Sequence, residues 1–131
     1  MTIKGSCCCG GVRFELFEPP AMVGACHCSR CRKVGSTVYA YVRAEAFHWV
    51  AGRHLLVRYR PKPPFSFNRV FCKRCGASLG DPDSGRVAAI AANCLDMQPS
   101  PSPDFHEYAP DAPAWDVIPE TERPYGRPNG E

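Results

Sequence analysis

Residues 26–31 read CHCSRC, and two further cysteine clusters lie far from this stretch, CCC at residues 7–9 and CKRCG at residues 72–76. Two cysteines that are separated by two residues on a tight turn can both place their sulfurs about 2.3 Å from one zinc ion. Glycine follows two of the clusters, at Gly10 and Gly76, and it adopts the positive φ that folds a backbone back toward a metal. Three such clusters in the first 75 residues predict a zinc protein.

The consecutive cysteines Cys7, Cys8 and Cys9 cannot all serve one metal if the segment is extended. Side chains alternate between the two faces of an extended strand, so Cys7 and Cys9 point one way and Cys8 points the other. We therefore interpret Cys7 and Cys9 as ligands and expect Cys8 to be a small buried hydrophobe.

The seven ligand candidates divide as four plus three. Four thiolates close the coordination shell of zinc and make a structural site, whereas three leave a position open for water or substrate, as catalytic zinc requires. In the first partition the open trio is Cys26, Cys28 and Cys31, and the closed site is Cys7, Cys9, Cys72 and Cys75. A competing partition closes a ribbon from Cys28, Cys31, Cys72 and Cys75, and leaves Cys7, Cys9 and Cys26. Spacing favours the first partition but leaves the second open.

The four histidines are not expected to bind metal. His27 stands between two ligand candidates, and in an extended segment it faces away from the metal that they hold. His48, His54 and His106 stand alone in the sequence, so we expect ordinary surface or core histidines.

Composition narrows the class of protein. The 131 residues suit one domain, residues 1–131, with 44% hydrophobic and 22% charged residues. The net charge of +3 is too small to indicate nucleic-acid binding, and we expect the basic run Arg58–Lys62 to be solvated. Neither a signal peptide nor a membrane span is apparent. The expected location is the cytoplasm, where clustered cysteines hold metal more often than they form disulfides.

Short strands joined by turns are predicted for the first 98 residues. Alternation and β-branched or aromatic residues indicate strands, and alanine-rich residues 87–92 fit a strand better than a helix. The predicted strands are Val12–Leu16, Thr37–Val42, Leu55–Arg60, Phe65–Phe71 and Val87–Ala92. Ser29–Gly35 is predicted to form one short helical turn.

The remainder of the chain differs in character, because eight of the 14 prolines lie from Pro99 onward. Proline lacks the amide donor of a helix or sheet, so we predict an extended tail over the surface, peripheral in residues 116–131. Within it Phe105, Tyr108 and Trp115 are expected to be packing anchors. Fraying is expected beyond Arg123.

The motifs together resemble those of the glutathione-dependent formaldehyde-activating enzyme family, which also contains centromere protein V. The resemblance runs from about Gly5 to Asp116 and rests on these residues: Gly5-Ser6-Cys7-x-Cys9-Gly10-x-Val12-x-Phe14, Cys26-His27-Cys28-Ser29-x-Cys31-Arg32, Arg69-x-Phe71-Cys72-x-x-Cys75-Gly76, Leu95-Asp96, and His106-Glu107-Tyr108 through Trp115-Asp116. It implies a mainly β fold of small coiled antiparallel sheets, sometimes called a β-tent, with two zinc ions. It also favours the first partition, with a structural four-cysteine site and a catalytic trio.

The resemblance further implies an activity like that of S-(hydroxymethyl)glutathione synthase. Such a carbon–sulfur lyase joins glutathione, or a related thiol, to formaldehyde or another small aldehyde. Cations beside the trio, at Arg30, Arg32 and Lys33, are placed to attract carboxylates of glutathione, and Arg32 matches the family motif. Two extra thiols, Cys8 and Cys94, depart from the family pattern.

Two rival functions share the same ligand pattern. A non-catalytic zinc module would use the second site as a scaffold or binding knuckle. A thiol redox enzyme would pair a closed zinc site with a reactive cysteine such as Cys8, Cys28 or Cys94, and would need a low thiol pKa there.

Overall fold

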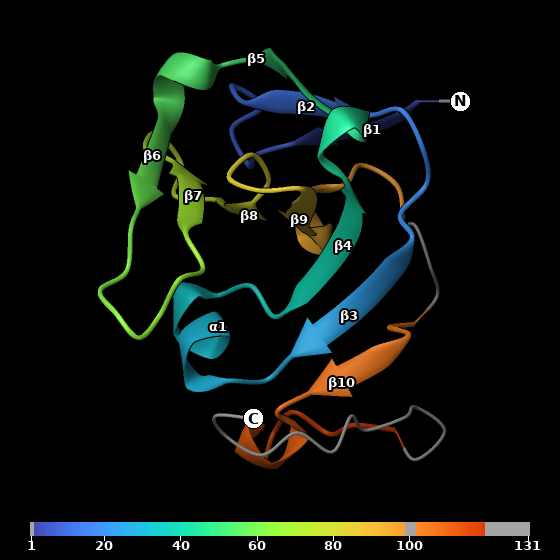
Figure 1. Cartoon of the computed structure of the whole chain (residues 1–131), viewed down its shortest axis with the longest axis vertical. Coiled ribbons are helices and arrows are strands. Elements are labelled where there is room, and N and C mark those ends of the chain that lie inside the picture. The colour runs from blue at the N-terminus through green and yellow to red at the C-terminus, as the bar shows by residue number, and fades with distance from the viewer. Residues whose placement is uncertain (1, 99–101, 120–131) are drawn as a thin grey trace.

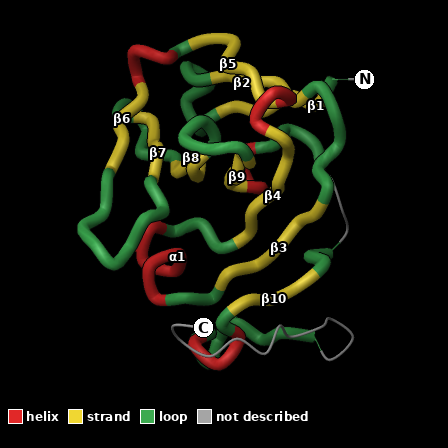
Figure 2. The backbone as a smooth tube through the Cα atoms, viewed as in Figure 1, coloured by secondary structure: helices red, strands yellow, loops and turns green. Residues whose placement is uncertain are grey.

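The structure is a computed structural model, and it describes residues 2–98 and 102–119 (Figure 1). Strands dominate the chain, and the helical elements are one short α-helix and single turns of 3-10 helix (Figure 2). The strands are β1 Ile3–Ser6, β2 Arg13–Leu16, β3 Met22–Cys26, β4 Val38–Arg43, β5 Phe47–Ala51, β6 Leu56–Tyr59, β7 Arg69–Cys72, β8 Ser78–Asp81, β9 Val87–Ala91 and β10 Phe105–Glu107. The helices are α1 Ser29–Val34, η1 Ala44–Ala46, η2 Arg53–Leu55, η3 Ala92–Cys94 and η4 Ala109–Asp111.

The strands form two sheets. The first has the order β1-β2-β5, and the second has the order β10-β3-β4-β9-β8-β7-β6. Every pairing is antiparallel except β10 with β3, which is parallel. The chain is therefore mainly β, as the sequence predicts, although its larger sheet is mixed and not purely antiparallel.

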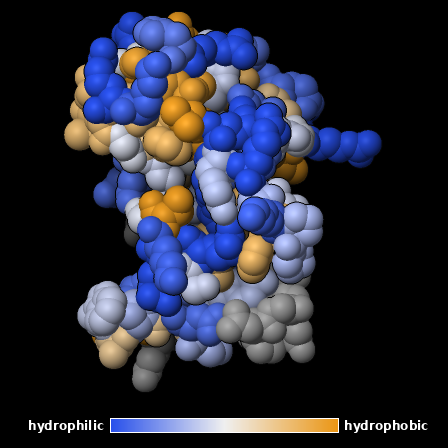
Figure 3. All heavy atoms as spheres, turned by 90° about the vertical axis from the view of Figure 1, so that its left-hand side faces the viewer, coloured by the Kyte–Doolittle hydropathy of each residue, from blue (hydrophilic) through white to orange (hydrophobic). Residues whose placement is uncertain are grey.

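The core draws buried side chains from both sheets. Phe14 on β2 contacts Phe47 and Trp49 on β5, with ring centroids 5.2 and 6.3 Å away. The predicted alternation holds on β2, where Phe14 and Leu16 are buried and Arg13 is exposed. The side of the molecule that carries β6 and β7 is largely hydrophilic, with scattered apolar groups (Figure 3). Arg58 on this side is half-buried and forms an ion pair with Asp83 at 2.6 Å, so the basic run is only partly solvated.

The sequence predicts β2, β4, β6 and β9 close to their observed bounds, but it names no strand at β1, β3, β5, β8 or β10, and it is wrong before β7. The predicted strand Phe65–Phe71 is wrong in its first half, because pairing begins at Arg69. Pro61, Pro63 and Pro64 stand immediately before this segment, and proline cannot donate to a ladder. Residues 65–68 consequently remain irregular.

The proline-rich segment contributes a strand of the sheet. Asp104 binds Val23 twice, through its backbone N to the Val23 carbonyl at 2.7 Å and through its carboxylate to the Val23 N at 2.8 Å. Phe105 then pairs with Gly24 and stacks near Tyr41, at 6.4 Å between centroids. The anchor prediction is confirmed for Phe105 and wrong for Trp115, whose side chain is 83% exposed. Residues beyond Arg123 lie outside the described residues.

Gly24 allows β10 to dock, because the Phe105 ring fills the space that a Cβ at this position would occupy. We expect Gly24→Ala to lower the free energy of unfolding by about 1–3 kcal/mol, as overpacking does in a filled site. Thermal or urea unfolding measures this change. Gly85→Ala is the matched control, because Gly85 is exposed and nothing lies within 4 Å of the added carbon. Equal stability of both variants would contradict the docking of β10 on β3.

Candidate metal centres

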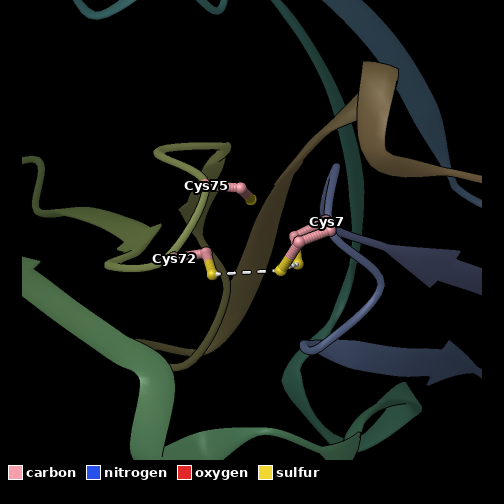
Figure 4. A group of neighbouring side chains, drawn as sticks. Cys7, Cys72 and Cys75 are labelled. Carbon is pink, nitrogen blue, oxygen red and sulfur yellow. Dashed lines mark hydrogen bonds between the residues drawn. The ribbon is translucent and has the colours of Figure 1, made fainter.

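Four thiols from two distant turns meet beside the core. Cys7 and Cys9 belong to the turn after β1, Cys72 ends β7, and Cys75 lies in the turn before β8. Cys72 and Cys75 face the segment that carries Cys7 (Figure 4). All four sulfurs lie within 4.8 Å of one another, and two of the separations are 3.5 Å for Cys7–Cys9 and 3.9 Å for Cys9–Cys72. Tetrahedral zinc with sulfurs at about 2.3 Å separates them by about 3.8 Å, so this group fits zinc.

The local backbone explains how short turns deliver paired thiols. Gly10 and Gly76 have φ of 75° and 79°, the left-handed conformation that the sequence predicts for them. The amide of Gly10 donates to the Cys7 carbonyl at 3.0 Å, and the amide of Gly76 donates to the Cys72 carbonyl at 2.7 Å. Each hydrogen bond closes a turn around its pair of cysteines.

Donors around this four-cysteine group favour thiolates. The Arg74 side chain donates from Nε to Cys9 Sγ at 3.3 Å, and this bond is the main reason that the pKa of Cys9 falls to about 6. The backbone amide of Ala77 likewise lowers the pKa of Cys75, whereas burial raises the pKa of Cys72. Thiolates are the form that binds metal, so the environment suits a thiophilic dication.

Three further thiols meet at the junction of β3 and α1. Cys26 ends β3, Cys28 caps the N-terminus of α1, and Cys31 lies within α1. Their sulfurs lie within 4.8 Å of one another, and the Cys31 amide donates to Cys28 Sγ at 3.4 Å. Hydrogen bonds from Cys26 and Cys31 lower the pKa of Cys28, whereas hydrogen bonds with Cys28 and Cys31 raise the pKa of Cys26. The structure thus assembles the groups of the first partition, and the ribbon of the competing one is not formed among the described residues.

The trio opens onto a cavity of about 730 Å³ between α1, the 64–69 segment and β10. Aromatic rings and two arginines line this cavity. Arg30 lies 3.9 Å over the ring of Phe65, and Arg69 lies 4.6 Å over the ring of Phe67. The four-cysteine group does not line this cavity. Of the two cysteine groups, the trio is therefore the one that combines an incomplete ligand set with this larger cavity.

Arg32 lies on a different face of α1 from Arg30. It lines a hollow of about 200 Å³ together with His27, Trp115 and Asp116, and it is absent from the lining of the trio cavity. The substrate role predicted for Arg32 therefore stays a prediction. Of the three cations named from the sequence, Arg30 lines the trio cavity, and the structure adds Arg69. The sequence carries a signal for Arg69, which begins the family motif Arg69-x-Phe71-Cys72-x-x-Cys75-Gly76.

His27 faces away from the trio, as the sequence predicts, and meets a second histidine. Its Nε2 lies 2.8 Å from Nδ1 of His106, the two rings stack at 5.1 Å, and both side chains are buried. Its Nδ1 lies 3.4 Å from the carboxylate of Asp116, and burial lowers the pKa of His27. His106 is a core histidine, as the sequence predicts, and 79 residues separate it from a partner that only the fold supplies. His48 and His54 are exposed surface residues.

The two extra cysteines belong to neither group. Cys8 is exposed, so the prediction of a buried hydrophobe is wrong, because residues 7–10 form a tight turn with Cys8 at its tip. Cys94 is buried and donates to the Ser78 carbonyl at 3.3 Å. Burial raises the pKa of Cys94 to about 11, which disfavours the reactive thiolate that a redox role requires.

The fold and site define a mainly β protein with two cysteine groups that can hold metal, one of them open to a cavity. The chain belongs to the glutathione-dependent formaldehyde-activating enzyme family, whose family model matches residues 2–111. It is similar to a Halomonas elongata protein provisionally named as a glutathione-dependent formaldehyde-activating enzyme, with 28% identity over 88% of this chain and 80% of the relative. A crystal structure of a Rhodobacter sphaeroides protein matches with a TM-score of 0.57 and 26% identity, over 71% of this chain and 87% of that one. Within the described residues, no helix is long and apolar enough to cross a membrane.

The four-cysteine group is expected to stabilise the fold when it holds metal. Cys72→Ser removes a fully buried ligand, so we expect loss of the metal from this group and a thermal midpoint lower by at least about 10 °C. Cys8→Ser is the control, because Cys8 is exposed and lies outside both groups. Elemental analysis measures the metal content of each variant, and thermal unfolding measures its midpoint. A Cys72→Ser variant that keeps its metal content and midpoint would exclude a structural role for this group.

Proposed function

We propose that the chain is a cytoplasmic, zinc-dependent carbon–sulfur lyase that joins glutathione or a related thiol to formaldehyde or another small aldehyde. The observation that carries this proposal is the open trio of thiols on the wall of a cavity large enough for a tripeptide thiol. Family membership supports the same reaction class.

The trio Cys26, Cys28 and Cys31 would hold the zinc of this site, and its three thiolates leave one coordination position for substrate. When bound there, zinc supplies the positive charge that stabilises a thiolate or polarises a carbonyl oxygen. In the synthetic direction the substrate sulfur forms a bond with the aldehyde carbon, and the thiol proton ends on the aldehyde oxygen. The reverse direction breaks the same carbon–sulfur bond.

The cavity lining suits a substrate that carries both signs of charge. Glutathione has two carboxylates and one ammonium group. Arg30 presents its guanidinium on the Phe65 ring, where a carboxylate can reach it, and Glu107 lines the same cavity on β10. The Phe67 ring and Tyr41 supply apolar walls between these charges. These residues bind and orient the thiol, so that its sulfur reaches the trio.

Zinc content and exchange kinetics test this proposal together. We expect about two zinc ions per chain in the wild type and about one in folded Cys28→Ser, because the two cysteine groups are separate. Exchange NMR with isotope-labelled formaldehyde and glutathione then measures formation of the adduct. The wild type should accelerate this exchange above the uncatalysed rate, and Cys28→Ser should not.

Cys8→Ser is the control for thiol loss and should match the wild type in both measurements. A wild type that holds two zinc ions without accelerating the exchange would instead support the non-catalytic zinc module. A wild type that holds one zinc ion, even after zinc is added, would remove the lyase proposal.

A pair of arginine variants tests how substrate is held. We expect Arg30→Ala to weaken glutathione binding about two- to fivefold, the value of an exposed charge pair. If the role predicted for Arg32 is correct, Arg32→Ala weakens binding as well, through the neighbouring hollow. Isothermal titration of glutathione into both zinc-loaded variants measures this. Loss in Arg32→Ala with no change in Arg30→Ala would reverse our assignment of the binding face.

A further inference from the structure

Arg69 is a buried cation without a carboxylate partner. It begins β7, its side chain is 5% exposed, and within residues 2–98 and 102–119 no carboxylate forms an ion pair with it. A guanidinium does not lose its proton in proteins, and burying an uncompensated charge costs several kcal/mol. A negative group must therefore be present near Arg69 in the functional protein.

The contacts of Arg69 identify that group. Its Nη1 donates to Cys31 Sγ at 3.6 Å and to the Tyr39 hydroxyl at 3.0 Å, and the guanidinium lies over the Phe67 ring. The Tyr39 hydroxyl donates its own hydrogen to the Ser36 carbonyl at 2.7 Å, so it can only accept from Arg69. Tyr39 and Phe67 thus hold the guanidinium in one place, and Cys31 is its remaining partner.

The charge of the trio matches this cation. Three thiolates around a divalent metal carry a net charge of −1. A buried guanidinium that donates to the Cys31 sulfur consequently stabilises this negative group in a medium that screens weakly.

We infer that Arg69 is the fixed counter-charge of the trio Cys26, Cys28 and Cys31 and thereby sets how tightly this group holds a divalent metal. Arg69 is a positioning residue, because it acts on the ligand Cys31 and not on the substrate. The inference rests on the trio as the second metal site of the proposed function and not on the reaction with aldehyde.

Zinc competition against a chromophoric chelator tests the inference on the full chain. Arg69→Met keeps the bulk and removes the charge, and we expect the trio to bind zinc about 10–100-fold more weakly, as for other partners of metal ligands. Arg69→Lys restores the charge and should recover most of this loss. The four-cysteine group reports folding, because it should keep its zinc in each variant. Arg58→Met is the matched control, because Arg58, on β6, forms an ion pair with Asp83 and does not contact the trio. Its trio should bind zinc as in the wild type.

Two results overturn the inference. Wild-type affinity in folded Arg69→Met shows that the charge is not needed, and an equal loss in Arg69→Lys and Arg69→Met shows that Arg69 acts only through packing. If Arg69→Met does not fold, Tyr39→Phe tests the inference instead. This variant keeps the charge of Arg69 but removes the hydroxyl that accepts from Arg69 at 3.0 Å. Weaker zinc binding by the trio supports the inference, and unchanged binding refutes it. A wild type with a single zinc ion removes the proposed function together with this inference, whereas an unaffected Arg69→Met removes the inference alone.

Discussion

The contact between residues 7–9 and residues 72–75 is the constraint on which the arrangement of the two sheets depends. Cys9 and Cys72 meet across 63 residues of sequence, and Cys7 and Cys72 are both part of the buried core. The first turn joins β1 to β2 in the smaller sheet, and the second joins β7 to β8 in the larger sheet. Because the unfolded chain holds no preformed group of this kind, metal binding there contributes directly to folding. A bridge between Gly5 and Leu95 reinforces the same junction.

The trio is local in sequence, but its surroundings are not. Cys26, Cys28 and Cys31 lie within one strand end and one short helix, whereas the walls of their cavity come from β4, the 64–69 segment and β10. β10 also brings His106 against His27, which lies between two of the thiols. Strand β10 thus contacts the trio loop through His106 and His27, and its Glu107 lines the cavity. A proline-rich segment can do this because three residues suffice for the pairing with β3.

The two arginines of the cavity differ in solvation, and this difference separates their roles. Arg30 is partly exposed and lies against Phe65, so solvent screens its charge in part. Arg69 is buried, so its charge acts over a short distance in a medium that screens weakly. The first suits reversible contact with a carboxylate, and the second suits permanent compensation of thiolates. Arg32, four residues after Cys28, faces a separate hollow.

The sequence by itself determined the features that depend on local chemistry. Paired cysteines before glycine indicated the ligand turns and carried the family resemblance. Alternation in residues 12–16 and the proline break near residue 61 indicated a mainly β fold. Alternation along the chain also placed His27 away from the metal, because neighbouring side chains of an extended segment point to opposite faces. Only the tertiary structure decided which side chains from distant segments meet: the pairing of His27 with His106, the exposure of Cys8 and Trp115, the partners of Arg69, and the hollow that receives Arg32. These depend on loop paths and strand order, which bring together distant residues such as His27 and His106, 79 positions apart, and leave no periodic signal in the sequence.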